Sequence, residues 1–174
     1  AWTRFTLARL YRDLGLPALG RTVMDDGLKA APTSEMRYAT ALYLNSVDDI
    51  DAATTVLAAV PDAERSEGMR NLGHNLAAQR LLREARLRVA EGHDDEARAL
   101  LRQAAQEAQN DPHMLASIGR EWIALGEPET GLHLVSDWLA AHPEDPRLDI
   151  RLRYGELLAA ADRDEALRQW IADS

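Results

Sequence analysis

The sequence predicts an all-α fold, a right-handed superhelix of about five stacked helical hairpins, and three observations support this prediction. Strand signals are nearly absent, because β-branched and aromatic residues are few and apolar residues recur at helical spacing. Small, large and turn-forming residues recur in a fixed order at intervals of about 34 residues. Prolines next to acidic residues, as in Glu127-Pro128-Glu129 and Pro143-Glu144-Asp145-Pro146, stand where successive helices would begin. We therefore expect one continuous solenoid over residues 1–174.

The first hairpin, residues 1–34, carries the repeat pattern most completely. Small Ala8 and Gly20 would let its two helices approach closely, and Met24 would fill the space between them. Gly15 stands at the expected turn, and Pro32 would end the second helix before the next hairpin begins. These positions match the pattern of the tetratricopeptide repeat.

Four further repeats follow in the same phase. Their predicted ranges are 35–61, 62–111, 112–145 and 146–174. The repeat 112–145 has Gly119 at the small position and Gly126 at the turn, so we expect Gly119, like Ala8 and Ala85, at a close helix crossing. The last repeat is the least regular, because Ala161 stands where the turn glycine is expected.

The register of the repeats slips between Pro61 and Leu81. This slip predicts an irregular or overlong helix near residues 63–90 in the third repeat. The alternative is a loop near Gly68 or Gly73 that divides this segment into two ordinary helices.

Composition and motif spacing argue against most enzyme classes. The net charge of −9 makes a nucleic-acid partner unfavourable, since phosphate binding depends on clustered cationic side chains. Cysteine is absent, and no two of the five histidines stand at the helical spacing of a metal site. Acidic pairs such as Asp48-Asp49 and Asp94-Asp95 are interpreted as helix caps at turns. We therefore predict no catalytic residue, no metal site and no cofactor.

Two further features bear on where the chain works. No apolar run approaches the roughly 18 residues that a membrane-spanning helix needs, so this fragment itself is not expected to cross a bilayer. The chain begins at Ala1 without an initiator Met, and we interpret it as a segment of a longer protein that carries its targeting signal elsewhere.

Arginines recur at one position of the repeat that commonly faces the concave groove of such a solenoid. This position holds Arg9, Arg86 and Arg120, with Leu42 in the second repeat and Tyr154 or Gly155 in the last, depending on the register. Guanidinium groups on one wall would bind carboxylates, sugar hydroxyls or an acidic peptide. The alternative is that these arginines form ion pairs with neighbouring Glu or Asp.

Two aromatic residues share the predicted groove. Trp2 and Phe5 would be partly exposed there and could stack on the apolar faces of sugar rings. The alternative interpretation is that they cover an upstream repeat.

Five stretches of sequence, spread over most of the chain, carry a family resemblance. They are Trp2-Thr3-Arg4-Phe5, Leu7-Ala8-Arg9-Leu10, Arg37-Tyr38-Ala39-Thr40-Ala41-Leu42-Tyr43-Leu44, Ala58-Ala59-Val60-Pro61 and Ala97-Arg98-Ala99-Leu100-Leu101-Arg102. In their order and irregular repeat spacing they resemble the late repeats of the cellulose synthase operon protein C family. The resemblance implies a periplasmic solenoid in a Gram-negative bacterium, followed in the parent protein by an outer-membrane β-barrel.

The function that the resemblance implies is a non-catalytic scaffold for the synthesis and export of cellulose or another exopolysaccharide in biofilms. Its expected partners are other subunits of the cellulose synthase and export complex, with the glucan chain or peptidoglycan as further ligands. Three alternatives stay open: a general tetratricopeptide adaptor of another complex, another exopolysaccharide-secretion protein of this fold, and a carbohydrate-binding module. The resemblance transfers no catalytic or binding residue to this segment.

Overall fold

The computed structural model describes residues 1–108, 111–144 and 148–173, and these residues form ten α-helices, one short 3₁₀ helix and no strand. The predicted all-α hairpin fold is therefore confirmed. The chain divides into two compact units, Ala1–Leu76 and Ala77–Ser174, each with its own apolar core. Within the described part of the chain, every helix is too short or too polar to cross a bilayer.

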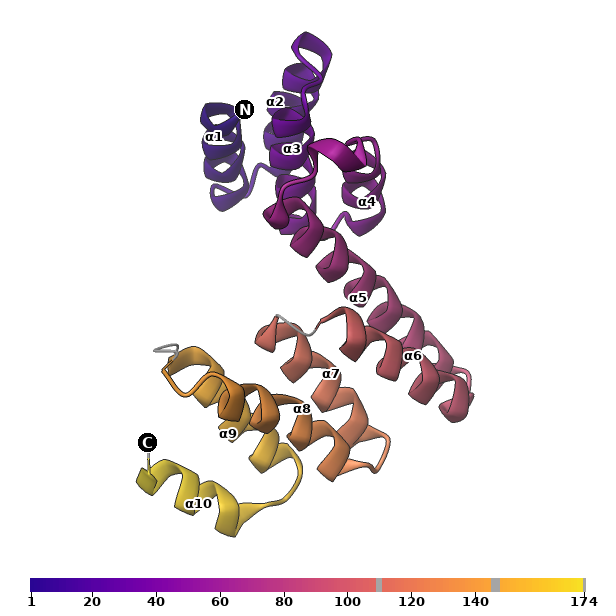
Figure 1. Cartoon of the computed structure of the whole chain (residues 1–174), viewed down its shortest axis with the longest axis vertical. Helices are drawn as coiled ribbons and strands as arrows, with labels where there is room; N and C mark the ends of the chain where they lie inside the picture. Colours follow the sequence, from indigo (N-terminus) through magenta and orange to yellow (C-terminus); the bar gives the residue numbers. More distant parts are fainter. Residues whose placement is uncertain (109–110, 145–147, 174) are drawn as a thin grey trace. The chain divides into compact units, whose positions relative to one another are not determined.

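The first unit consists of two hairpins and the beginning of a third. Its elements are α1 (Trp2–Asp13), α2 (Pro17–Ala30), α3 (Ser34–Ser46), α4 (Ile50–Ala58), the 3₁₀ helix Asp62–Glu64 and the first part of α5 (Glu67–Ala90). Helix α1 packs against both α2 and α3, and α3 packs against α4 (Figure 1). Ala8 and Gly20 mark the crossing of the first pair, where a Cβ atom added to Gly20 would lie 2.6 Å from the carbonyl oxygen of Ala8.

Tyr43 joins the two hairpins of the first unit. Its side chain is fully buried on α3, among Met24, Met36 and other apolar residues. Its hydroxyl donates a hydrogen bond to the carbonyl oxygen of Pro17, at 2.6 Å, in the first turn of α2. Burial raises the pKa of this phenol, and the hydrogen bond supplies the partner that a buried hydroxyl requires.

The second unit continues the same hairpin arrangement. Its elements are the second part of α5, α6 (Asp94–Glu107), α7 (Pro112–Ala124), α8 (Pro128–Ala141), α9 (Leu148–Ala160) and α10 (Asp164–Asp173). Helix α7 packs against α6, α8 and α9. Trp122, Ile118 and Val135 are buried in the core that these helices share.

Close helix crossings occur where the sequence predicts them. A Cβ atom added to Gly119 would lie 2.6 Å from the carbonyl oxygen of Gly131, so α7 and α8 touch backbone to backbone. Ala85 on α5 and Ala97 on α6 are both buried in the core of the second unit. The prediction that Gly119 and Ala8 lie at such crossings is confirmed.

Each hairpin turns through one residue in the left-handed backbone conformation. These residues, with their φ angles, are Gly15 (76°), Asp48 (62°), Gly92 (79°), Gly126 (79°) and Asp162 (55°). The interpretation of Ala161 as the residue at the last turn is wrong by one position. Aspartate occupies the left-handed region more readily than alanine, because its short polar side chain can form local hydrogen bonds.

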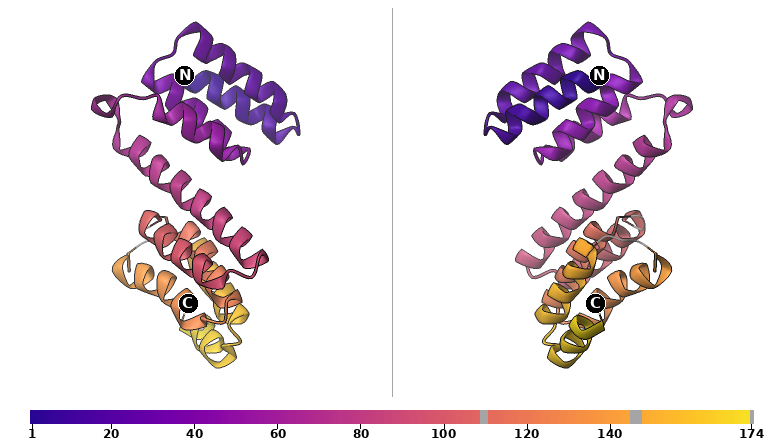
Figure 2. Two further views of the ribbon diagram at one scale, coloured as in Figure 1. Left: turned by 90° about the vertical axis from the view of Figure 1, so that its right-hand side faces the viewer. Right: turned by 90° about the vertical axis from the view of Figure 1, so that its left-hand side faces the viewer.

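The overlong helix in the third hairpin is confirmed. Helix α5 comprises 24 residues, from Glu67 to Ala90, and Figure 2 shows it as one uninterrupted helix. The alternative of a loop near Gly68 or Gly73 is wrong, because both glycines lie inside α5. The helix begins at Glu67 rather than near residue 63, since the 3₁₀ turn Asp62–Glu64 intervenes.

Acidic residues near turns cap the following helices. The side chain of Asp49 accepts a hydrogen bond from the backbone N–H of Ala52. The side chain of Asp111 accepts hydrogen bonds from the backbone N–H groups of His113 and Met114. Asp94 and Asp95 lie in the first turn of α6, where the helix dipole favours negative charge. The predicted helix start at Pro143-Glu144-Asp145-Pro146 falls partly outside the described residues, which exclude Asp145 and Pro146.

Asp49→Ala should destabilise the first unit by about 1 kcal/mol, because the variant loses both the N-cap of α4 and the ion pair with Arg21. Asp49→Asn keeps a capping oxygen and should cost less. The hydrogen bond from Arg21 lowers the pKa of Asp49 below its ordinary value of 3.8. The ion pair therefore stabilises the fold at pH values above the ordinary pKa of Asp49, and this stabilisation disappears as the pH falls through the lowered pKa.

Urea unfolding of the parent chain and both variants, at neutral and acidic pH, measures these effects. The free energy of unfolding of the parent should exceed that of Asp49→Asn at neutral pH, and this difference should shrink below about pH 4. An advantage that grows on acidification would contradict the role assigned to the ion pair.

Candidate functional site

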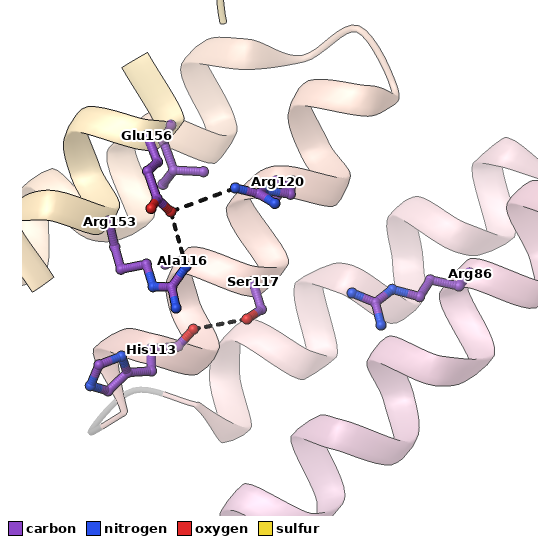
Figure 3. Close-up of a pocket in the computed structure, with 8 residues that line it drawn as sticks. Arg86, His113, Ala116, Ser117, Arg120, Arg153 and Glu156 are labelled. Carbon is purple, nitrogen blue, oxygen red and sulfur yellow. Dashed lines mark hydrogen bonds and ion pairs between the residues drawn. The ribbon is translucent and has the colours of Figure 1, made fainter. Parts of the chain in front are cut away.

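A polar hollow of about 210 Å³ lies on the second unit. Its lining comes from α5, α7 and α9, which are the first helices of three successive hairpins (Figure 3). We call it the arginine hollow. The residues that line it are Arg86, His113, Ala116, Ser117, Arg120, Arg153, Glu156 and Leu157. Two of the three arginines predicted to face the groove, Arg86 and Arg120, are therefore in one site.

Helical periodicity explains why these side chains share a face. On α7, residues 113, 116, 117 and 120 are three or four positions apart, and such residues lie on one side of a helix. On α9, residues 153, 156 and 157 follow the same spacing. The other side of α7 carries Gly119 and Trp122, which pack in the core and fix the helix in place.

Ion pairs connect the three helices around the arginine hollow. The Nε of Arg86 donates a hydrogen bond to Glu121 on α7, at 2.8 Å. On α9, Glu156 accepts a hydrogen bond from Arg153 at 2.9 Å, and the same carboxylate lies 3.7 Å from Arg120 on α7. The alternative of pairs with neighbouring carboxylates is thus observed for Arg86 and Arg120. These side chains remain largely exposed, at 55% and 60% of their surface.

The residues that line the hollow carry more positive than negative charge, in a chain whose net charge is −9, and Glu121 and Asp149 pair with Arg86 and His113 from outside the lining. Three of its eight residues are arginines and one is a glutamate. A single carboxylate, that of Glu156, pairs with both Arg120 and Arg153. Exposed pairs of this kind contribute only about 0–1 kcal/mol, so a carboxylate from outside can replace the internal one at little cost.

Two polar residues at the edge of the hollow make internal contacts. His113 Nε2 lies 3.0 Å from a carboxylate oxygen of Asp149 on α9. The hydroxyl of Ser117 donates to the backbone carbonyl oxygen of His113, one turn earlier on α7. Among the described residues, no group of three or more His, Asp or Glu is arranged to hold a metal ion.

The remaining predicted site residues, Trp2, Phe5 and Arg9, lie on α1 in the first unit. The rings of Trp2 and Phe5 meet edge to face with centroids 5.8 Å apart, and Trp2 meets Tyr38 on α3 in the same way at 5.9 Å. The guanidinium carbon of Arg9 lies 5.7 Å from the centroid of the Phe5 ring. Trp2 is 44% exposed. Binding by these residues stays a prediction.

A second hollow, of about 430 Å³, lies between α4 and the start of α5. Its floor is apolar, with Leu57, Met69 and Leu76, and Arg65 and Arg70 stand at its rim. Both arginines donate hydrogen bonds to backbone carbonyl oxygens nearby in the chain. Their guanidinium groups already hold the local backbone, unlike those of the arginine hollow.

Sequence reasoning missed Tyr38, Arg153 and Glu156. The repeat phase could have found Tyr38, which occupies in the second repeat the position that Phe5 occupies in the first. Glu156 was hidden by the one-residue error at the last turn: once Asp162 is aligned with Gly126, Glu156 aligns with Arg120. Arg153 aligns with Ser117, and no pattern of residue type marks that position.

Comparison with known proteins gives two relatives. The chain is 33% identical over 172 residues to "Cellulose synthase operon protein C" of Xanthomonas axonopodis pv. citri (strain 306), a match of 96% of this chain and 11% of the relative. It is 27% identical over 163 residues to the protein of the same name from Pseudomonas fluorescens (strain SBW25), covering 93% of this chain and 13% of the relative. The predicted resemblance is confirmed, and the chain spans about a tenth of these relatives. No family model matches the chain.

Proposed function

Nearly all of this chain matches a part of cellulose synthase operon protein C, and we propose that the chain is a non-catalytic scaffold segment that binds partner proteins during cellulose synthesis and export. The names of both relatives support a role in cellulose synthesis. The hairpin fold supports a binding role, because stacked hairpins present long surfaces built from equivalent helices.

The observation that carries this proposal is the arginine hollow. It gathers exposed cationic side chains from three hairpins in an otherwise acidic chain. Its one hydroxyl group, that of Ser117, donates to the backbone of its own helix, and this arrangement favours binding over nucleophilic chemistry.

The location and partners that we propose follow the family resemblance. The segment works in the periplasm of a Gram-negative bacterium, as part of an outer-membrane protein. Other subunits of the cellulose synthase and export complex are its partners, and the scaffold holds the synthase machinery near the outer-membrane pore. The glucan chain and peptidoglycan are further ligands in this proposal.

Replacing Arg9, Arg86 and Arg120 together with Ala, in the longer protein that contains this segment, should reduce cellulose secretion. The fold should persist, because each surface substitution changes the free energy of unfolding by less than about 0.5 kcal/mol. Binding of a cellulose-specific dye by colonies measures secretion. Circular dichroism of the purified segment measures its helicity and its thermal unfolding.

A second triple variant controls for loss of charge. Lys29, Arg163 and Arg168 are also exposed, but they lie on or next to α2 and α10, outside the arginine hollow. Their replacement with Ala removes the same charge and should leave secretion unchanged. Normal secretion by the first variant, or an equal loss in both, would refute the proposed binding role.

A further inference from the structure

One carboxylate already occupies part of the arginine hollow. Glu156 lies between two guanidinium groups, with an oxygen 2.9 Å from Arg153 and 3.7 Å from Arg120 (Figure 3). The site therefore accommodates a carboxylate at this place. The Glu156 side chain is about half exposed, so a carboxylate of another molecule can reach this place from solvent.

Arg86 adds a cation that Glu156 does not contact. Figure 3 shows its side chain extending from α5 toward α7. Its Nε donates a hydrogen bond to Glu121. A guanidinium carries several N–H donors in a planar fork, and that fork matches the two oxygens of a carboxylate. The terminal nitrogens of Arg86 are therefore suited to a further acceptor.

The size and lining of the hollow restrict the ligand. Its volume of about 210 Å³ is smaller than the roughly 300–1,000 Å³ of a site for a drug-sized molecule, so it takes a group of side-chain size. None of the eight lining residues is Trp, Tyr or Phe, which disfavours stacking of sugar rings at this place. The two apolar residues of the lining, Ala116 and Leu157, are only 6% and 2% exposed, so the surface offered to a ligand is mainly polar.

We propose that the arginine hollow binds a side-chain carboxylate from an acidic peptide segment of a partner protein. The incoming carboxylate replaces Glu156 on Arg120 and Arg153, and Arg86 adds positive charge to the same hollow. Glu156 thus acts as an internal competitor that occupies the site when no partner is bound. This inference rests on the proposed function in one respect, namely that the first helices of the hairpins form a surface that binds proteins.

If Glu156 competes with the ligand, substitutions at Glu156 and at the arginines should change the affinity for the ligand in opposite directions. Arg120→Gln removes a donor to the ligand and Arg86→Gln removes a positive charge from the hollow, and each should weaken binding about two- to fivefold, the range for an exposed ion pair. Glu156→Gln frees two guanidinium groups and should strengthen binding several-fold. Arg168→Gln on α10 removes the same charge outside the hollow and should change affinity by less than about twofold.

Fluorescence anisotropy with a labelled hexa-glutamate peptide and the 174-residue chain tests these expectations. A hexa-glutamine peptide of the same length provides the uncharged comparison, and unlabelled cellohexaose provides a glucan competitor. Circular dichroism of each variant establishes that its helicity is unchanged. Because the variants at residues 120 and 156 act in opposite directions, a general loss of folding cannot reproduce the expected pattern.

Three results would overturn the inference: unchanged or weaker binding by Glu156→Gln, equal losses in Arg168→Gln and Arg86→Gln, or displacement of the peptide by cellohexaose. The last would identify the glucan as the ligand. Failure of the proposed function looks different. In that case the peptide results hold, but cellulose secretion is normal when the arginines are replaced in the longer protein.

Discussion

Trp122→Ala should lower the free energy of unfolding of the second unit by about 3 to 5 kcal/mol, the range for removal of a large buried aromatic side chain. Trp122 is 2% exposed and lies on α7, which packs against α6, α8 and α9. The guanidinium carbon of Arg102 on α6 lies 5.5 Å from the centroid of its ring, so the variant also loses a cation–π contact. Urea unfolding followed by circular dichroism measures the change.

Trp2→Ala provides the matched control for this substitution. Trp2 is 44% exposed on α1, so its removal creates no enclosed cavity and should cost less than about 2 kcal/mol. Equal costs for the two variants would show that Trp122 does not hold the core of the second unit together.

Gly119→Leu should destabilise the second unit by about 1 to 3 kcal/mol, because the crossing of α7 and α8 has no room for a side chain. Even a Cβ atom at Gly119 would lie 2.6 Å from the carbonyl oxygen of Gly131, and a Cβ atom at Gly131 would clash with the carbonyl oxygen of Gly119. The obstacle is backbone on both sides, so the helices themselves must move apart. Thermal unfolding of the variant should show the loss as a lower melting temperature.

Gly155→Ala tests whether this cost comes from crowding or from the loss of any helical glycine. A Cβ atom at Gly155 would meet Leu167 at 3.6 Å, an ordinary contact. Alanine is favoured over glycine inside a helix by about 0.5–1 kcal/mol, so this variant should be as stable as the parent or more stable. If Gly119→Leu had the same melting temperature as the parent, Gly119 would not lie at the crossing of α7 and α8.

The arginine hollow was partly predictable from the sequence. The repeat phase put Arg86 and Arg120 at equivalent positions, and the structure brings both to one hollow, although their role in binding stays a prediction. Glu121 was not predicted as the partner of Arg86, because that contact depends on the distance and rotation between α5 and α7. Glu156 was missed because the register of the last hairpin depended on one turn residue.

The sequence by itself determined the helical class, the hairpin order, the overlong α5 and the crossings at Ala8 and Gly119. These features follow from local rules: helical periodicity, the need for small residues where helices touch, and the residues that turns accept. The tertiary structure decided that Asp162 forms the last turn, and it decided which carboxylates face which arginines. Such pairings depend on the register of separate helices, and only their packing in space fixes that register.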